Sequence, residues 1–80
     1  MITLYTKDYC PYCVMAKSLL NSLTVTFEEV DLTGDSEGFR DLYEKSHMRT
    51  LPQIFVGEIC LGGYDDISAL HKNGKLLEKF

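Results

Sequence analysis

The sequence predicts an α/β fold in which a four-stranded mixed sheet is flanked by three helices. Three observations predict it. An apolar, β-prone run at residues 2–5 precedes a helical pattern, a second strand and helix follow within residues 24–46, and residues 53–61 have the pattern of a hairpin. A βαβ unit joined to a hairpin gives the order β-α-β-α-β-β-α and one mixed sheet, and the length of 80 residues fits a single domain, 1–80.

The first half of the chain predicts a strand, a helix and a second strand. ITLY at residues 2–5 is typical of a short buried strand. Cys10-Pro11 predicts a helix start, because proline suits the first helical position, and apolar residues recur at helical spacing up to Leu23. TVTFEEV at residues 24–30 alternates and is rich in branched side chains, which favours a strand.

The second half predicts a helix, a hairpin and a last helix. Residues 33–36 indicate a turn and a helix start, with acidic residues early in the helix and Lys45 late, as the helix dipole favours. Gly57-Glu58 lies between two apolar runs and predicts a type II′ turn with antiparallel strands. The last helix opens at residues 64–66 and stops at residues 73–74, after which Leu76, Leu77 and Phe80 are expected to dock the tail.

Composition excludes several classes of function. The chain has 12 acidic and 8 basic residues, a net charge of -4, which argues against a nucleic-acid partner. No apolar run approaches the roughly 18 residues of a membrane span, and residues 1–5 lack the features of a secretory signal. Three cysteines, two of them clustered, indicate a reducing compartment, so we expect a cytoplasmic protein.

CPYC at residues 10–13 is the strongest chemical signal. If the helix starts at Pro11, Cys10 is its N-cap, where free N–H groups and the helix dipole lower a thiol pKa below its usual value of about 8.5. Lys7 adds a nearby positive charge, and Cys13, one turn into the helix, is expected to be more buried. One exposed attacking thiol and one protected resolving thiol are what disulfide exchange needs.

Two other uses of the cysteines are less favoured. A structural disulfide across so short a loop constrains little of the unfolded chain. A zinc site would need Cys60, His47 or His71 as further ligands, and the chain has no second closely spaced cysteine pair. Cys60 fits better as a small buried hydrophobic residue, and both histidines as partners of helix C-termini.

Two further stretches predict a site for an extended ligand. Pro52 precedes a buried strand, either as a plain strand start or as a cis-proline that turns the Leu51 N–H and C=O outward to pair with a peptide. Residues 62–66, GGYDD, combine a close backbone approach with helix N–H donors and carboxylates, which suits an α-amino acid. The alternative is simple helix capping by Asp65 or Asp66.

Together these stretches resemble the glutaredoxin family. YTKDYCPYC (5–13), RTLPQIFV (49–56) and LGGYDD (61–66) have its order and spacing, and the dithiol CPYC form and the short length resemble bacterial or phage members. The resemblance implies a thioredoxin-like fold over residues 1–80, a cis Pro52 facing the cysteines, Cys10 as nucleophile and Cys13 as resolving thiol. It implies glutathione as reductant and no metal.

The resemblance also implies a glutathione groove. The lysine matching Lys7 meets the glycine carboxylate, with Arg49 as a possible helper, the residues matching Leu51 and Pro52 pair with the cysteinyl backbone, and those matching Tyr64 and Asp65 hold the γ-glutamyl end. The expected glutathione-binding residues are Lys7, Tyr12, Thr50, Leu51, Pro52, Gly63, Tyr64 and Asp65. Leu51 stands where valine is more common, and Phe39 stands where some members carry a polar residue for glutathione.

The function implied is glutathione-dependent reduction of protein disulfides and glutathione mixed disulfides by a monomeric enzyme. Ribonucleotide reductase is one candidate protein substrate. Two alternatives stay open: a thioredoxin-like electron donor recycled by a flavoprotein reductase, and an iron–sulfur scaffold that bridges two subunits through Cys10 and glutathione. The Tyr64-Asp65-Asp66 stretch argues against the first, and proline after Cys10 is unfavourable for the second.

Overall fold

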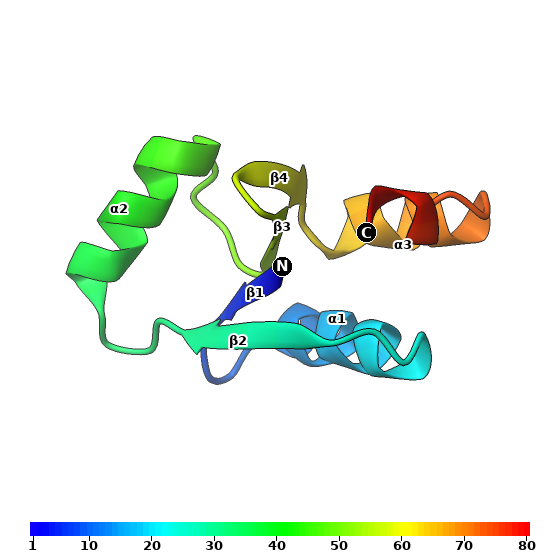
Figure 1. Cartoon of the computed structure of the whole chain (residues 1–80). Helices are drawn as coiled ribbons and strands as arrows, with labels where there is room; N and C mark the ends of the chain where they lie inside the picture. Colours follow the sequence, from blue (N-terminus) through cyan, green and yellow to red (C-terminus); the bar gives the residue numbers. More distant parts are fainter.

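Four strands form one mixed sheet in the order β2-β1-β3-β4 in the computed structural model, which describes residues 1–80 (Figure 1). The strands are β1 (Ile2–Thr6), β2 (Phe27–Asp31), β3 (Gln53–Val56) and β4 (Ile59–Gly62). β1 pairs parallel with β2 and antiparallel with β3, and β3 pairs antiparallel with β4. The predicted α/β class and mixed sheet are therefore confirmed.

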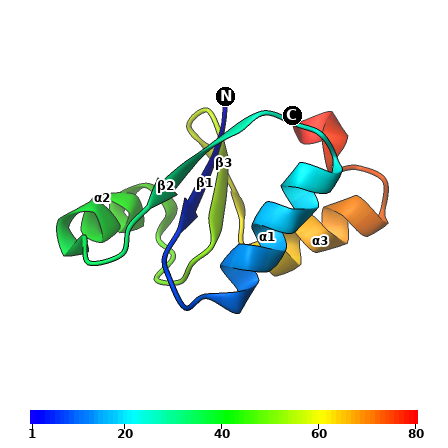
Figure 2. The same cartoon turned by 90° about the horizontal axis from the view of Figure 1, so that it is seen from below.

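Three helices cover the two faces of the sheet. They are α1 (Pro11–Ser22), α2 (Ser36–Ser46) and α3 (Tyr64–Lys72), and a 3₁₀ turn, Leu77–Lys79, ends the chain. In the view of Figure 2, α1 and α3 lie side by side on one side of the sheet and α2 lies on the other. The element order is the predicted one, and no helix has the length and apolar character needed to span a bilayer.

The core follows from the alternation of side chains along β1. Ile2 and Leu4 point to the α1/α3 face and join the larger apolar cluster, together with Ala16, Leu20, Ile54, Ile67 and Leu76. Tyr5 points to the other face and packs against a smaller cluster of Leu32, Leu42 and Phe55 under α2. Because successive strand residues face opposite sides of a sheet, the two clusters hold both helical layers to the same strands.

Local sequence signals explain where several elements begin and end. Asp35 is the N-cap of α2 and accepts a hydrogen bond from the Gly38 N–H, at 2.8 Å. The α2 helix ends at Ser46, and its C-cap residue His47 has a left-handed φ of 59°. Gly57 has φ 59° whereas Glu58 has no positive φ, as the predicted type II′ turn requires.

Two details of the fold differ from the prediction. The second strand begins at Phe27 and not at Thr24, because Thr24 has a left-handed φ of 55° and residues 24–26 pair with no neighbouring strand. In the tail, Leu76 is buried and Phe80 packs on the core, but Leu77 is 57% exposed. The 3₁₀ turn that follows Leu76 directs Leu77 away from the core.

Candidate active site

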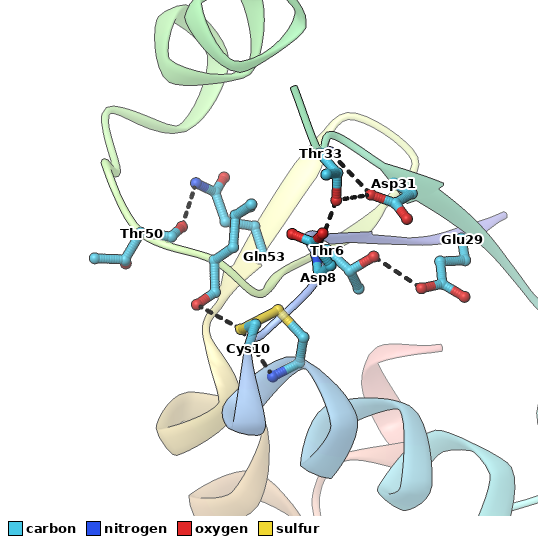
Figure 3. The surroundings of a disulfide bond; sticks show 10 residues. Thr6, Asp8, Cys10, Glu29, Asp31, Thr33, Thr50 and Gln53 are labelled. Atoms are coloured by element: carbon cyan, nitrogen blue, oxygen red, sulfur yellow. Dashed lines mark hydrogen bonds between the residues drawn. A yellow bond between two sulfur atoms is a disulfide. The ribbon is translucent and has the colours of Figure 1, made fainter. Parts of the chain in front are cut away.

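Cys10 and Cys13 lie at the start of α1 and are joined by a disulfide bond (Figure 3). Cys10 is the N-cap residue in extended conformation and Pro11 is the first helical residue, as predicted. The backbone N–H of Cys13 donates a hydrogen bond to the Cys10 sulfur, with 3.2 Å between N and Sγ. A donor aimed at that sulfur at a helix N-terminus stabilises negative charge there once the pair is reduced.

The two cysteines differ less in exposure than expected. Cys10 is 9% exposed and Cys13 is 3% exposed, so Cys13 is the more buried of the two as predicted, but Cys10 is buried as well and not exposed. The sulfur of Cys10 is bonded to Cys13 on one side and lies 3.7 Å from the carbonyl oxygen of Leu51 on another. In the oxidised form these neighbours cover most of the reactive atom.

The Leu51–Pro52 segment lies directly beside the disulfide. The peptide bond between Leu51 and Pro52 is cis, as the resemblance implied. The contact between the Leu51 carbonyl and the Cys10 sulfur connects a loop to a helix start that lies 41 residues earlier in the chain. The structure therefore brings together two of the three sequence stretches singled out above.

Gln53 holds this loop in place and was missed by the sequence analysis. Its side chain is fully buried, and its Nε2 donates to the carbonyl oxygens of Met48 (3.2 Å) and Thr50 (2.9 Å). Its Oε1 is buried without a partner. A polar residue inside the otherwise apolar strand QIFV, directly after Pro52, was the available signal.

A cavity of about 360 Å³ opens between the loop before β3 and the start of α3. Neither cysteine lines it, but Tyr12 from the CPYC motif does, and so does Leu51, whose carbonyl oxygen lies 3.7 Å from the Cys10 sulfur. Its lining includes seven of the predicted glutathione-binding residues: Tyr12, Thr50, Leu51, Pro52, Gly63, Tyr64 and Asp65. Tyr12 and Tyr64 are in contact with each other in this lining, with ring centroids 6.1 Å apart and ring planes tilted by 40°. Met48 and Asp66 also line the cavity, and the predicted set of binding residues did not contain them.

Two of the predicted basic residues do not line this cavity. Lys7 is exposed in the loop before Cys10 and is not among the lining residues. Arg49 lines a different cavity, where its guanidinium lies 4.7 Å from the ring centroid of Tyr43.

The start of α3 separates the roles of its two acidic residues. Asp66 accepts a hydrogen bond from the Gly63 N–H, with 2.9 Å between N and Oδ2, so its carboxylate caps the helix. Gly62 has φ 114°, and a Cβ there would overlap the same carboxylate. Asp65 is exposed and makes none of these contacts, which leaves its carboxylate open to a ligand in the cavity.

A hydrogen bond and an ion pair at Glu29 of β2 hold the end of β1, which leads to the cysteines. Buried Thr6 donates to Glu29 at 2.8 Å, and Lys17 pairs with the other oxygen of Glu29 at 2.7 Å. The bond from Lys17 holds the pKa of Glu29 below its ordinary value.

A second contact holds the loop before Cys10. The Asp8 N–H donates to the Thr33 hydroxyl at 2.8 Å, and that hydroxyl donates to Asp31 at 2.6 Å. This hydroxyl, helped by the Thr33 N–H, lowers the pKa of Asp31. The loop that carries Lys7 and leads to Cys10 is thus fixed to the end of β2.

The third cysteine, Cys60, takes no part in the disulfide. Cys60, in β4, is partly buried, and its sulfur lies 4.0 Å from the Met48 sulfur. Burial raises the pKa of the Cys60 thiol, and the charge of Asp66 adds to this, so Cys60 favours the unreactive protonated form. The structure has no group of three or more His, Cys, Asp or Glu side chains placed to hold a metal ion.

This arrangement fits reversible disulfide chemistry. One cysteine of the pair has a donor at its sulfur and touches a backbone carbonyl, its partner is more deeply buried, and a groove lined by backbone and aromatic groups begins next to them. Such a groove can align an extended thiol ligand for in-line attack on a disulfide sulfur.

Sequence comparisons point to one family. A family model described as glutaredoxin matches residues 2–60. Glutaredoxin from Pseudomonas aeruginosa is 43% identical over 75 residues, covering 94% of this chain and 89% of that protein. Glutaredoxin 3 from Escherichia coli K12 is 40% identical over 75 residues, covering 94% and 90%.

Solved structures agree with the sequence comparisons. The solution structure of glutaredoxin from Brucella melitensis has a TM-score of 0.84 and 40% identity, covering 96% of this chain and 84% of that one. The crystal structure of a buckwheat glutaredoxin–glutathione complex has a TM-score of 0.87 and 30% identity, covering 96% and 73%. The first is a bacterial protein, and the second has the same fold with glutathione bound.

Proposed function

The chain belongs to the glutaredoxin family, and we propose that it uses glutathione to reduce protein disulfides and glutathione mixed disulfides through Cys10 and Cys13. The observation that carries this proposal is the position of the disulfide. It lies at a helix start, with the Cys10 sulfur 3.7 Å from the Leu51 carbonyl and beside a cavity of about 360 Å³.

The first step is attack by Cys10. Its thiolate bonds to one sulfur of the substrate disulfide, the substrate S–S bond breaks, and the second substrate sulfur leaves as a thiolate that takes a proton from water. Cys10 is the attacker because the Cys13 N–H points at its sulfur and the helix start favours negative charge.

The second step releases the reduced substrate. For a protein disulfide, the Cys13 thiolate attacks the Cys10 sulfur, so that the Cys10–Cys13 bond forms and the substrate leaves with both electrons. Two glutathione molecules then reduce the Cys10–Cys13 disulfide and become oxidised glutathione. For a glutathione mixed disulfide, a second glutathione attacks the adduct on Cys10 directly, so that Cys13 is not needed.

Glutathione is expected to lie in the cavity as an extended chain. Its cysteinyl backbone pairs with the Leu51 backbone next to Pro52, which places its sulfur at Cys10. Its γ-glutamyl carboxylate meets the free N–H groups at the start of α3, and its ammonium meets Asp65, since Asp66 already caps the helix.

The opposite end of glutathione then points toward the loop before Cys10. Its glycine carboxylate is expected to meet Lys7, which is exposed and held on a loop fixed by the Asp8–Thr33 bond. Tyr12 and Thr50 form the sides of the groove between the two ends. This assignment predicts that Lys7→Gln raises KM for glutathione by about twofold to fivefold, because the substitution removes an exposed ion pair.

The proposal is tested by glutathione-dependent reduction of a small glutathione mixed disulfide. Wild type and Cys13→Ser are expected to be active and Cys10→Ser inactive. Cys60→Ser, which removes the one cysteine outside the disulfide, is the matched control with wild-type activity. Wild-type turnover only when a flavoprotein reductase replaces glutathione would contradict the proposal.

The biological setting follows from the same chemistry. We propose that the chain acts as a monomer in the reducing cytoplasm, where glutathione is the available reductant. Disulfide-containing and glutathionylated proteins are its substrates, and ribonucleotide reductase is a candidate among them.

A further inference from the structure

The thioether of Met48 lies in the wall of the cavity proposed for glutathione, and the proposed reaction does not use it. Met48 is partly buried and lines this cavity together with Gly63. Its sulfur lies 4.0 Å from the sulfur of Cys60 in β4. Its methyl carbon lies 3.9 Å from the position that a Cβ on Gly63 would occupy. The side chain therefore fills the space between β4, the residue before α3 and the cavity.

The backbone of Met48 is fixed on both sides. Its N–H donates to the Ser46 hydroxyl at 3.1 Å, and its carbonyl oxygen accepts from the Gln53 Nε2 at 3.2 Å. The side chain can change its rotamer, but these bonds keep its Cα beside the cavity. A chemical change at the sulfur is therefore felt where glutathione is expected to bind.

A thioether undergoes one modification readily, which is two-electron oxidation by a hydroperoxide. The sulfur lone pair attacks one oxygen of hydrogen peroxide, the O–O bond breaks, and the proton of the transferred oxygen passes to the leaving oxygen, which departs as water. The sulfur is oxidised to a sulfoxide and the peroxide is reduced. Hydrogen peroxide is small enough to enter the cavity of about 360 Å³ that Met48 lines.

The other sulfur atoms of the chain do not give the same effect. Cys10 and Cys13 are joined in the disulfide and present no thiolate to the oxidant. Burial raises the pKa of the Cys60 thiol and keeps it in the less reactive protonated form. Met1 and Met15 are exposed, but neither lines the cavity. Of the three methionines, only Met48 places an oxidised sulfur at the proposed glutathione site.

We propose that Met48 is an oxidation site and that its sulfoxide weakens the binding of glutathione. The Cys60 sulfur, at 4.0 Å, leaves no room for an oxygen between the two sulfur atoms, so the new oxygen points into the cavity. The neighbouring contact with Gly63 places it near the start of α3, where the γ-glutamyl carboxylate is expected to bind. The partial negative charge of the sulfoxide oxygen repels that carboxylate, and the oxygen takes up part of its space. The inference rests on the proposed function, because it concerns the same glutathione site.

The test treats the disulfide form of the protein with hydrogen peroxide, removes the peroxide, and measures KM for glutathione in the reduction of a small glutathione mixed disulfide. Peptide mapping by mass spectrometry measures the oxygen gained at each methionine and at Cys60. Wild type is expected to gain one oxygen at Met48 and to show a KM raised by about threefold to tenfold, the size expected for one lost polar contact. Methionine sulfoxide reductases are expected to restore the original KM.

Substitutions then locate the effect. Met48→Leu has a similar volume and cannot form a sulfoxide, so its KM is expected to be the same before and after peroxide. Met48→Gln carries an amide oxygen on a side chain of similar length, so its KM is expected to exceed that of Met48→Leu without any peroxide. Met15→Leu removes an exposed methionine outside the cavity and is the matched control, expected to respond to peroxide as wild type does.

The outcomes separate the two proposals. An equal rise of KM in peroxide-treated Met48→Leu, an unchanged KM in wild type that carries the Met48 sulfoxide, or no oxygen at Met48 would overturn the role of Met48 while the untreated enzyme stayed active. Failure of untreated wild type to reduce the small glutathione substrate would instead overturn the proposed function.

Discussion

Gln53 is predicted to control catalysis by holding the loop that touches Cys10. It is completely buried and donates to the carbonyls of Met48 and Thr50, the residues that lead into Leu51 and Pro52. Leucine at this position has a similar volume but no donor. Gln53→Leu therefore tests the loop without opening a large cavity.

The expected stability loss is small because two effects oppose each other. Losing two neutral hydrogen bonds costs about 2 kcal/mol. Removing the unpartnered Oε1 of Gln53 from the interior regains about 1 kcal/mol. The net loss of about 1 kcal/mol corresponds to a Tm lower by about 4–8 °C in a domain of this size.

The expected loss of activity is larger than the stability change explains. Freed from Gln53, the loop no longer fixes the Leu51 carbonyl and backbone at Cys10, so kcat/KM for a small glutathione mixed disulfide should fall about tenfold. Thermal unfolding followed by circular dichroism measures the change in Tm, and the coupled glutathione assay measures the change in kcat/KM.

A matched control separates positioning from stability. Ile2→Val removes one buried methylene at the far end of β1 and should cost about 1 kcal/mol with no change in activity. If Gln53→Leu keeps wild-type kcat/KM while its Tm falls as predicted, the loop does not depend on Gln53 and the reasoning is refuted.

Two other predictions concern stability. Lys17 lowers the pKa of Glu29 in the folded protein. The ionised Glu29 therefore stabilises the fold fully above pH 4.5, its ordinary pKa, and this stabilisation is lost as the pH falls through the lower pKa of the folded state. Glu29→Gln should cost about 1 kcal/mol in urea unfolding at pH 7 and much less near pH 3, and an equal cost at both would contradict the linkage. Gly62→Ala should cost about 2–3 kcal/mol, because its φ of 114° is strained for alanine and the new Cβ overlaps the Asp66 carboxylate. Gly57→Ala, with φ 59° and open space around it, should cost less, and an equal loss would show that the contact with Asp66 is unimportant.

The features predicted well are those that local sequence determines. Pro11 after Cys10 specifies the start of α1, and Gly57 specifies the hairpin turn, because each acts through its own backbone preferences. The start of β2 was placed three residues early because the branched residues before Phe27 suit a strand equally well. Only pairing with β1, which no local pattern encodes, shows where the strand begins.

The site was predictable in its residues more than in its contacts. The groove-lining residues were found because their stretches match a family pattern, whereas the Gln53 bonds to Met48 and Thr50 depend on how the loop folds over β3. The placement of Arg49 beside Tyr43 in a separate cavity likewise depends on how α2 packs, which spacing along the chain does not specify.

The most direct test of the central claim is the mass of the Cys13→Ser protein after incubation with oxidised glutathione. Without its resolving thiol, the protein should gain one glutathione, located by peptide mapping on Cys10, and the Cys10→Ser protein should gain none under the same conditions. Glutathione found on Cys60 in place of Cys10, or no adduct in the Cys13→Ser protein, would contradict the role of Cys10 as the nucleophile.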